Sequence, residues 1–134
     1  MEPIISNFGY LPLDIEFIRF IRDITEELGI LLIFDEIQSF RVASGGAQEA
    51  FDITPDMTTL GKIIGGGLPV GAFGGKEEIM ELFDPTSLNY DIAHAGTFNG
   101  NPLTMEAGVT VMKNLTENNF KKMNDLGEIL RIKL

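Results

Sequence analysis

Apolar residues recur at helical spacing along residues 15–28 and are followed at once by an unbroken apolar run. The repeating positions are Ile15, Ile18, Ile21, Ile24 and Leu28. Asp14 is suited to cap the start of such a helix, and Gly29 is suited to end it. A short continuous run such as Ile30–Phe34 after a helix is typical of a strand covered on both faces, as in a parallel sheet. We therefore predict a helix followed by a buried strand.

The rest of the pattern predicts two more strands, three more helices and several polar segments. The further strands are predicted at Met57–Leu60 and Val70–Phe73, with a flexible turn at residues 65–67 between them. The predicted helices cover residues 76–83, 102–118 and 120–134; residues 1–13 are expected to be extended, and residues 35–50 and 84–101 to be loops rather than packed elements. Strands that alternate with helices indicate the α/β class. Three strands are few for so many helices, so we expect part of the fold to lie outside this chain.

Composition and charge narrow the class of partner. A chain of 134 residues, 44% hydrophobic and 22% charged, amounts to one domain of an ordinary globular protein. Its net charge of −10 argues against nucleic acid and membrane surfaces as partners, because phosphate backbones and anionic lipids repel it. The sequence has no cysteine, no apolar run long enough to cross a bilayer and no leader-like start, so a cytoplasmic location is expected. A small anion could still bind to local N–H groups and a lysine.

Three features lie where α/β folds place ligands, after strands or before a helix. Asp35 directly follows the first apolar run, Lys62 follows the second predicted strand, and Thr97 lies in a glycine-bearing loop before a predicted helix. Each has a plainer interpretation, because Asp35 could cap a loop, Lys62 could be a surface lysine at a turn, and the Thr97 loop could simply lead into the helix. Together they supply the amine, the carboxylate and the phosphate donors that pyridoxal phosphate (PLP) requires. No metal-ligand spacing occurs.

Four motifs resemble, in order, those of the class III PLP-dependent aminotransferases. They are the runs Leu32–Gln38, Thr54–Lys62, Gly65–Ala72 and Gly96–Leu103. Within that family, the runs Phe40–Ala43 and Gly45–Gln48 are most similar to the glutamate-1-semialdehyde 2,1-aminomutases. The resemblance implies a type I PLP-transferase large domain with a mixed, mostly parallel sheet and helices. It further implies that residues 1–134 are a single partial domain, truncated at both ends, whose helical residues 103–134 lead toward a small domain.

The resemblance also implies roles for four residues. Lys62 would form the Schiff base with PLP and then move protons as general acid and base, and Asp35 would pair with the pyridinium nitrogen. Gln38 is similar to the residue that hydrogen-bonds the phenolic oxygen of the ring, and Thr97 to the threonine that binds the phosphate across a homodimer interface. The implied reaction transfers the amino group of a small amino acid or amino-aldehyde, in the aminomutase case from glutamate-1-semialdehyde to give 5-aminolevulinate.

The sequence departs from the family pattern in three ways. The segment after Asp35 is one residue shorter, with Ser39 in place of a Thr-Gly pair, and Asn99 replaces a typical serine. Gln38 suits ordinary transaminases, whereas aminomutases commonly have an apolar residue there. Finally, the upstream phosphate turn, the aromatic that stacks on the ring and most of the small domain have no counterpart in these residues. Two hypotheses stay open, an aminotransferase-type enzyme and a catalytically inactive fragment of one, and an acidic interaction module is least favoured. Because apolar faces would stay uncovered, we expect marginal stability or association of the isolated chain.

Overall fold

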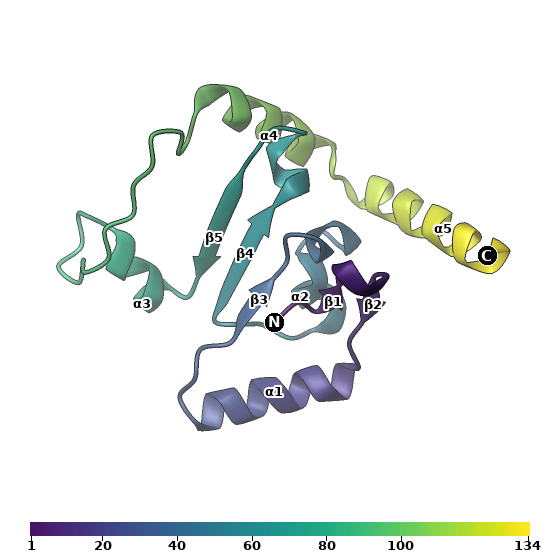
Figure 1. The fold of residues 1–134 in the computed structure, drawn as a ribbon, viewed down its shortest axis with the longest axis horizontal. Coiled ribbons are helices and arrows are strands. Elements are labelled where there is room, and N and C mark those ends of the chain that lie inside the picture. The colour runs from purple at the N-terminus through teal and green to yellow at the C-terminus, as the bar shows by residue number, and fades with distance from the viewer.

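A three-stranded mixed sheet forms the centre of the computed structural model, which describes all 134 residues (Figure 1). Its strands are β3 (Ile33–Asp35), β4 (Met57–Gly61) and β5 (Gly71–Gly75), in the order β3-β4-β5. The β3–β4 pair is parallel and the β4–β5 pair is antiparallel. The α/β class and the three strands are thus confirmed, while the parallel character expected of most of the sheet is limited to one of two pairings.

The N-terminal segment lies along the free edge of β3. Residues 4–12 form a small antiparallel hairpin, in which β1 (Ile4–Ile5) and β2 (Leu11–Pro12) flank a 3-10 turn at Ser6–Phe8. The amine of Met1 donates to the carbonyl oxygen of Ile33 at 2.6 Å, and the N–H of Asp35 donates to the carbonyl oxygen of Met1 at 2.8 Å. These are the two bonds of a parallel bridge. The backbone at residue 1 therefore runs parallel to β3, on the side opposite β4.

Helix α1 (Ile15–Glu27) begins and ends where the sequence predicts. The Asp14 side chain accepts from the N–H groups of the second and third helical residues, as an N-cap does, and Gly29 has a φ of +64° just after the helix. Ile18 on this helix is fully buried. The buried core cluster consists of Ile18, Leu32, Phe34 and Ile53. The helix therefore covers one face of β3.

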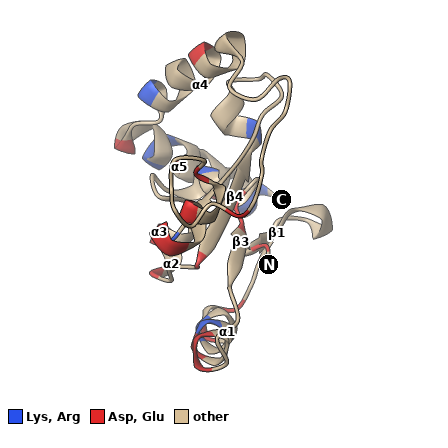
Figure 2. Ribbon diagram, turned by 90° about the vertical axis from the view of Figure 1, so that its left-hand side faces the viewer, with Lys and Arg blue, Asp and Glu red and all other residues tan.

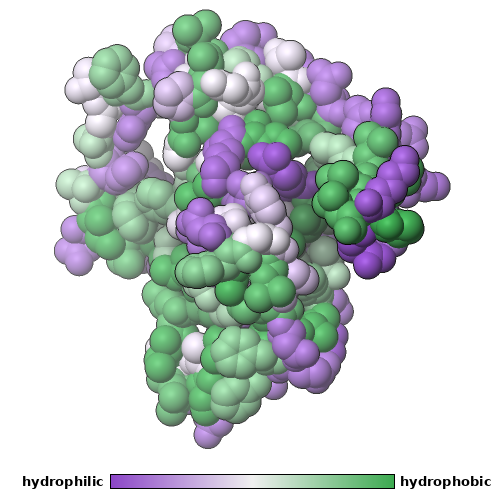
Figure 3. Space-filling model, turned by 45° about the vertical axis from the view of Figure 1, so that its right-hand side comes forward, coloured by the Kyte–Doolittle hydropathy of each residue, from purple (hydrophilic) through white to green (hydrophobic).

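The opposite face of β3 is bare, so the prediction of a strand covered on both faces is wrong for this chain. Leu31 is 54% exposed and Ile33 is 40% exposed, whereas the alternating Leu32 and Phe34 are buried. No other element of the chain supplies a layer over that face. Only 16 of 134 residues are buried, and hydrophobic side chains form much of the surface around α1, at the bottom of the space-filling view (Figure 3). Marginal stability or association of the isolated chain stays a prediction, and this small core supports it.

The segment predicted as a loop over residues 35–50 is instead packed, which corrects that prediction. It contains a 3-10 turn at Ser39–Val42 and the helix α2 (Gly46–Phe51). Ser39, Gly46 and Ala47 are buried here, together with the carboxylate of Glu36. The polar composition concealed this packing because a buried carboxylate, rather than an apolar stripe, organises the segment.

The remaining elements agree with the predicted order. They are a 3-10 turn at Lys62–Gly65, α3 (Glu77–Met80) with a 3-10 turn at Glu81–Phe83, α4 (Pro102–Asn114) and α5 (Glu117–Lys133). Helix α4 ends four residues before the predicted limit, because the Thr116 side chain accepts from the N–H of Asn119 and caps α5. Helix α5 extends away from the sheet, and only Phe120 on it is buried (Figure 1). No helix has the length and apolar character needed to span a bilayer.

A buried carboxylate, Asp56, ties α1, β3 and the start of α3 together. Its Oδ2 accepts from the N–H of Leu32 at 2.7 Å and from Arg22 at 2.9 Å, and its Oδ1 lies 2.6 Å from the Lys76 ammonium. Lys76 and Asp56 lie 20 positions apart, so no local pattern in the sequence indicates this pairing. Burial raises the pKa of Asp56, but the hydrogen bonds from Lys76, Leu32 and Arg22 outweigh burial and hold the pKa at about 2.

This network makes stability depend on acid pH. Because the folded pKa of Asp56 lies below the value of about 3.9 in an unfolded chain, its contribution is complete above that pH and is lost as the pH falls toward 2. After allowance for solvent screening, we expect roughly 1–2 kcal/mol of unfolding free energy to be lost over this range. Urea unfolding between about pH 6 and about pH 2 measures it. The Asp56→Asn variant should show a flatter pH dependence, and an unchanged slope in that variant would contradict the assignment.

Candidate functional site

Lys62 lies at the carboxyl end of β4 in an unusual backbone conformation. Its φ is +46°, in the left-handed region that residues other than glycine rarely adopt. Its side chain is exposed and takes part in no hydrogen bond or ion pair within the chain. Left-handed residues of this kind are held in place by their surroundings and are often found at functional sites. The Lys62 amine that the sequence singled out is therefore exposed and unpaired within the chain, at a residue with a left-handed backbone.

Helix α4 holds the turn that carries Lys62. A Cβ atom added at Gly108 on this helix would lie 2.5 Å from the carbonyl oxygen of Ile64 in the turn. A Cβ at Gly66 would lie equally close to the carbonyl oxygen of Ala107. Only glycine allows backbones to approach this closely. The loop that contains Thr97 leads directly into α4, so its exit point is fixed relative to the Lys62 turn.

Asp35 lies at the same edge of the sheet as Lys62. The strands β3 and β4 are parallel, and Asp35 is paired with Thr59, three residues before Lys62. One carboxylate oxygen of Asp35, Oδ1, accepts from the N–H of Ile37 at 3.1 Å, and Oδ2 accepts no hydrogen bond within the chain. The half-buried Gln38 follows, at the start of the 3-10 turn. The structure thus brings the predicted amine and the predicted carboxylate to one edge of the sheet. Oδ2 of the carboxylate remains available to accept a hydrogen bond.

Glu36, next to Asp35, fastens this edge to α2. Its carboxylate is fully buried and accepts from the N–H groups of Ala47 and Gln48, the side-chain amide of Gln48 and the hydroxyl of Ser39. Gly46 has a φ of +79°, and a Cβ there would lie 2.5 Å from the Glu36 carboxylate. The Gln48 amide also donates to the hydroxyl of Thr58 on β4. The buried Glu36 carboxylate therefore stabilises the segment that follows β3.

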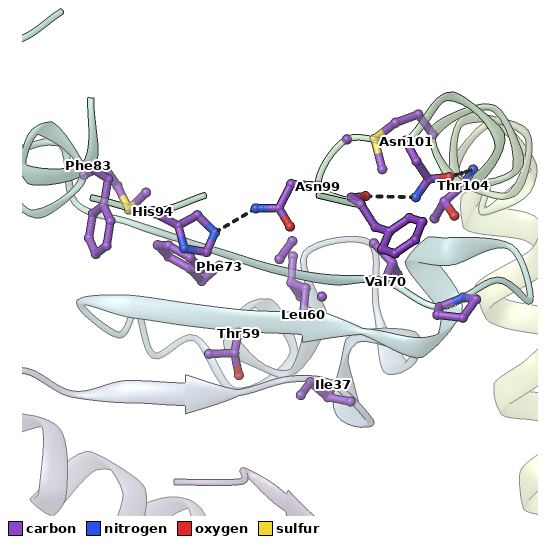
Figure 4. Close-up of a pocket in the computed structure, with 17 residues that line it drawn as sticks. Ile37, Thr59, Leu60, Val70, Phe73, Phe83, His94, Asn99, Asn101 and Thr104 are labelled. Carbon is purple, nitrogen blue, oxygen red and sulfur yellow. Dashed lines mark hydrogen bonds between the residues drawn. The ribbon is translucent and has the colours of Figure 1, made fainter. Parts of the chain in front are cut away.

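The Thr97 loop is not assembled with Lys62 in this chain. Thr97 is exposed and makes no hydrogen bond within the chain, whereas Asn101 caps α4 by accepting from the N–H of Thr104. An open cleft of about 990 Å³ separates this loop from β5 (Figure 4). Phe73 lies at the cleft, edge-on to Phe83 at 5.0 Å and to His94 at 5.2 Å between ring centroids. Thr97 is absent from the lining, so its role toward a phosphate stays a prediction.

A second, shallow pocket of about 520 Å³ contains Lys62 itself and reveals a residue that sequence reasoning missed. Its lining consists of Arg41, Lys62, Ile63, Gly67, Leu68 and Pro69. In the sequence, Arg41 stands out only as part of the run Phe40–Ala43. One signal could have identified it, because Arg41 is the only lysine or arginine between Asp35 and Lys62.

These residues fit PLP in part. The exposed amine of Lys62 is the kind of group that reacts with the aldehyde of PLP, and the free Oδ2 of Asp35 is an acceptor suited to its protonated ring nitrogen. Both residues lie at one edge of the sheet. The backbone and side-chain donors for the phosphate are not gathered at that edge. No group of three or more His, Cys, Asp or Glu side chains is placed to hold a metal ion.

Comparison with known proteins gives one consistent family. The family model described as aminotransferase class-III matches residues 1–134. The chain is 51% identical, over 98% of its length, to a glutamate-1-semialdehyde 2,1-aminomutase from Methanobrevibacter smithii, and 55% identical, over 90%, to one from Citrifermentans bemidjiense. It covers 30% and 28% of those proteins, respectively. Among solved structures, an omega-transaminase from Sphaerobacter thermophilus matches 98% of this chain with a TM-score of 0.93 and 47% identity, and 30% of that protein is covered.

Proposed function

This chain belongs to the class III aminotransferase family, and from that membership we propose that it supplies the Lys62 and Asp35 side of a site for PLP-dependent amino-group transfer. The observation that carries the proposal is that Lys62 and Asp35 lie at the carboxyl ends of two parallel strands. The Lys62 amine has no partner in the chain, and one of the two Asp35 carboxylate oxygens accepts no hydrogen bond. The chain spans about 30% of the length of the relatives it matches, so the activity belongs to the site that the complete protein forms.

Bound PLP would supply an electron sink for the carbon that bears the amino group. The residues of this chain would then hold and transfer protons near the bound PLP. Lys62 Nζ would provide the nucleophilic amine and would then move a proton between carbons as general acid and base. Asp35 Oδ2 would pair with the ring nitrogen of PLP, and Gln38 would donate a hydrogen bond to the phenolic oxygen. Thr97 would bind the phosphate of the PLP held by a second subunit, so the functional unit would be a homodimer.

The first candidate reaction is an intramolecular amino transfer on a small amino-aldehyde, as in glutamate-1-semialdehyde aminomutases. Sequence identity of 51–55% with proteins of that name supports it. The second candidate is a transaminase with separate donor and acceptor. Gln38 favours the second, because aminomutases commonly have an apolar residue at that position, and the likeness to an omega-transaminase structure agrees.

The test of the proposal is covalent capture of PLP by Lys62. The chain is incubated with PLP, reduced with borohydride and digested, and the modified peptides are quantified by mass spectrometry. We expect stoichiometric label on Lys62 at PLP concentrations that leave exposed lysines such as Lys113 and Lys121 mostly unlabelled. Equal labelling of all exposed lysines would contradict a built site in this chain and would favour the inactive-fragment hypothesis.

A further inference from the structure

The loop before α4 contains the one Asn-Gly pair of the chain, Asn99-Gly100. Every other asparagine precedes a residue with a side chain, and no aspartate precedes a glycine. The backbone nitrogen of the next residue can attack an asparagine amide, in an intramolecular reaction that releases ammonia. A side chain on that next residue hinders the attack, whereas glycine leaves its nitrogen accessible and its backbone adaptable. Asn99 also replaces a typical serine of the family, and serine has no amide to lose.

The backbone nitrogen of Gly100 is available for this attack. Both residues of the pair are exposed, and a Cβ added at Gly100 would meet no other part of the chain within 4 Å. The N–H of Gly100 donates no hydrogen bond within the chain, and the turn around it is closed only by the N–H of Asn101, which donates to the carbonyl oxygen of Phe98 at 3.3 Å. Gly100 has a φ of +62°, and glycine reaches other values of φ at little cost. The turn can therefore open and bring the Gly100 nitrogen to the side-chain carbonyl of Asn99.

His94 contacts the amide nitrogen that has to leave. Its Nε2 lies 3.5 Å from Nδ2 of Asn99 (Figure 4). The imidazole lies edge-on to the rings of Phe73 and Phe83, at 5.2 and 6.5 Å between centroids, and these contacts hold it beside Asn99. Ammonia can leave only after the amide nitrogen has gained a proton, and an imidazolium this close can give that proton directly or through one water. His94 is therefore placed to act as the general acid for loss of the amide.

We propose that Asn99-Gly100 is a site of spontaneous modification, at which Asn99 deamidates with His94 as the proton donor. The Gly100 nitrogen loses its proton to water and forms a bond to Cγ of Asn99. The bond between Cγ and Nδ2 breaks, and Nδ2 leaves as ammonia with a proton from His94, which is then replaced from water. A second water molecule opens the resulting cyclic imide at either of its carbonyl groups. One opening gives aspartate, and the other gives isoaspartate, in which the main chain runs through the former side chain.

The reaction changes both the charge and the backbone of the loop. Residues 92–105 include no lysine, arginine, aspartate or glutamate, so this stretch is tan in Figure 2. Asn99 lines the cleft of about 990 Å³, and its product therefore adds a carboxylate to an uncharged part of that cleft. Isoaspartate also lengthens the main chain between Phe98 and Asn101, the two residues that close the turn. If Thr97 binds a phosphate, a carboxylate two positions away repels it, and this consequence alone rests on the proposed function.

The test is the rate at which each asparagine of the folded chain becomes an acid at neutral pH. Samples taken over time are digested, mass spectrometry locates the converted residues, and chromatography separates aspartate from isoaspartate. We expect conversion at Asn99 while two neighbours stay intact: Asn89, whose amide donates to Glu81, and Asn101, whose following proline has no N–H. Gly100→Ala should slow the conversion by roughly tenfold. Faster conversion of Asn89 than of Asn99, or an unchanged rate in Gly100→Ala, would overturn the site.

His94→Gln tests the proton donor, because glutamine keeps a hydrogen-bonding side chain but cannot deliver a proton as an imidazolium does. We expect conversion of Asn99 to slow by roughly tenfold in the folded chain and to be unaffected in urea, where His94 is no longer held beside Asn99. An equal slowing in urea, or no slowing in the folded chain, would overturn the role of His94. These rates are measured without PLP, so failure of the Lys62 label leaves the deamidation site standing, and an unreactive Asn99 leaves the proposed function standing.

Discussion

Lys62→Gly is expected to abolish the PLP label and at the same time to stabilise the fold by about 1 kcal/mol. The loss of label follows from removal of the reactive amine. The gain follows from the φ of +46° at this position, because a Cβ in the left-handed region clashes with the backbone and glycine has none. The opposite changes in function and stability are what a residue held in a strained conformation for its chemistry should show.

Two companion variants separate the causes. Lys62→Ala removes the amine but keeps a Cβ at the strained position, so it should lose the label without gaining stability. Lys113→Ala, on exposed helix α4, should keep the label on Lys62 and change stability by less than about 0.5 kcal/mol. Label is quantified by mass spectrometry and stability by urea unfolding. Selective labelling of another lysine in Lys62→Gly would contradict the assignment of the amine.

Features determined by neighbouring residues could be predicted from the sequence. The limits of α1 follow from Asp14 and Gly29, which act within one turn of the helix. The common edge of Asp35 and Lys62 follows from their places just after two predicted strands, because parallel strands have their carboxyl ends at the same edge of the sheet.

Features determined by distant residues could not be predicted in the same way. The donors to Glu36 lie up to 12 residues further on, and Asp56 binds partners 34 and 24 residues before it and 20 residues after it. No local sequence pattern predicts such pairings. The bare face of Leu31 and Ile33 has a different cause, since an apolar strand has the same sequence whether or not a covering layer is present in the chain.

Glu36→Ala is expected to cost roughly 3 kcal/mol or more of unfolding free energy, the largest loss of stability from any single substitution considered. The carboxylate is fully buried and satisfies four donors, two of them the first N–H groups of α2 beyond Gly46. Alanine would leave those buried donors without partners and create a cavity beside Gly46, whose left-handed backbone fits this carboxylate. Because the core is small, such a loss should unfold much of the chain at room temperature.

Glu49→Ala provides the matched comparison, because Glu49 is also a carboxylate that accepts from a backbone N–H at the start of the same helix. It is exposed and accepts only one hydrogen bond, from Gly45 at 2.6 Å. Its replacement should cost less than about 1 kcal/mol, since water can solvate the N–H of Gly45 and alanine favours the helix. Circular dichroism during urea unfolding compares the two variants. Equal stabilities of the two variants would show that the burial of Glu36 and its four donors do not stabilise the fold. The connection between β3 and α2 would then depend on the backbone of the Ser39–Val42 turn.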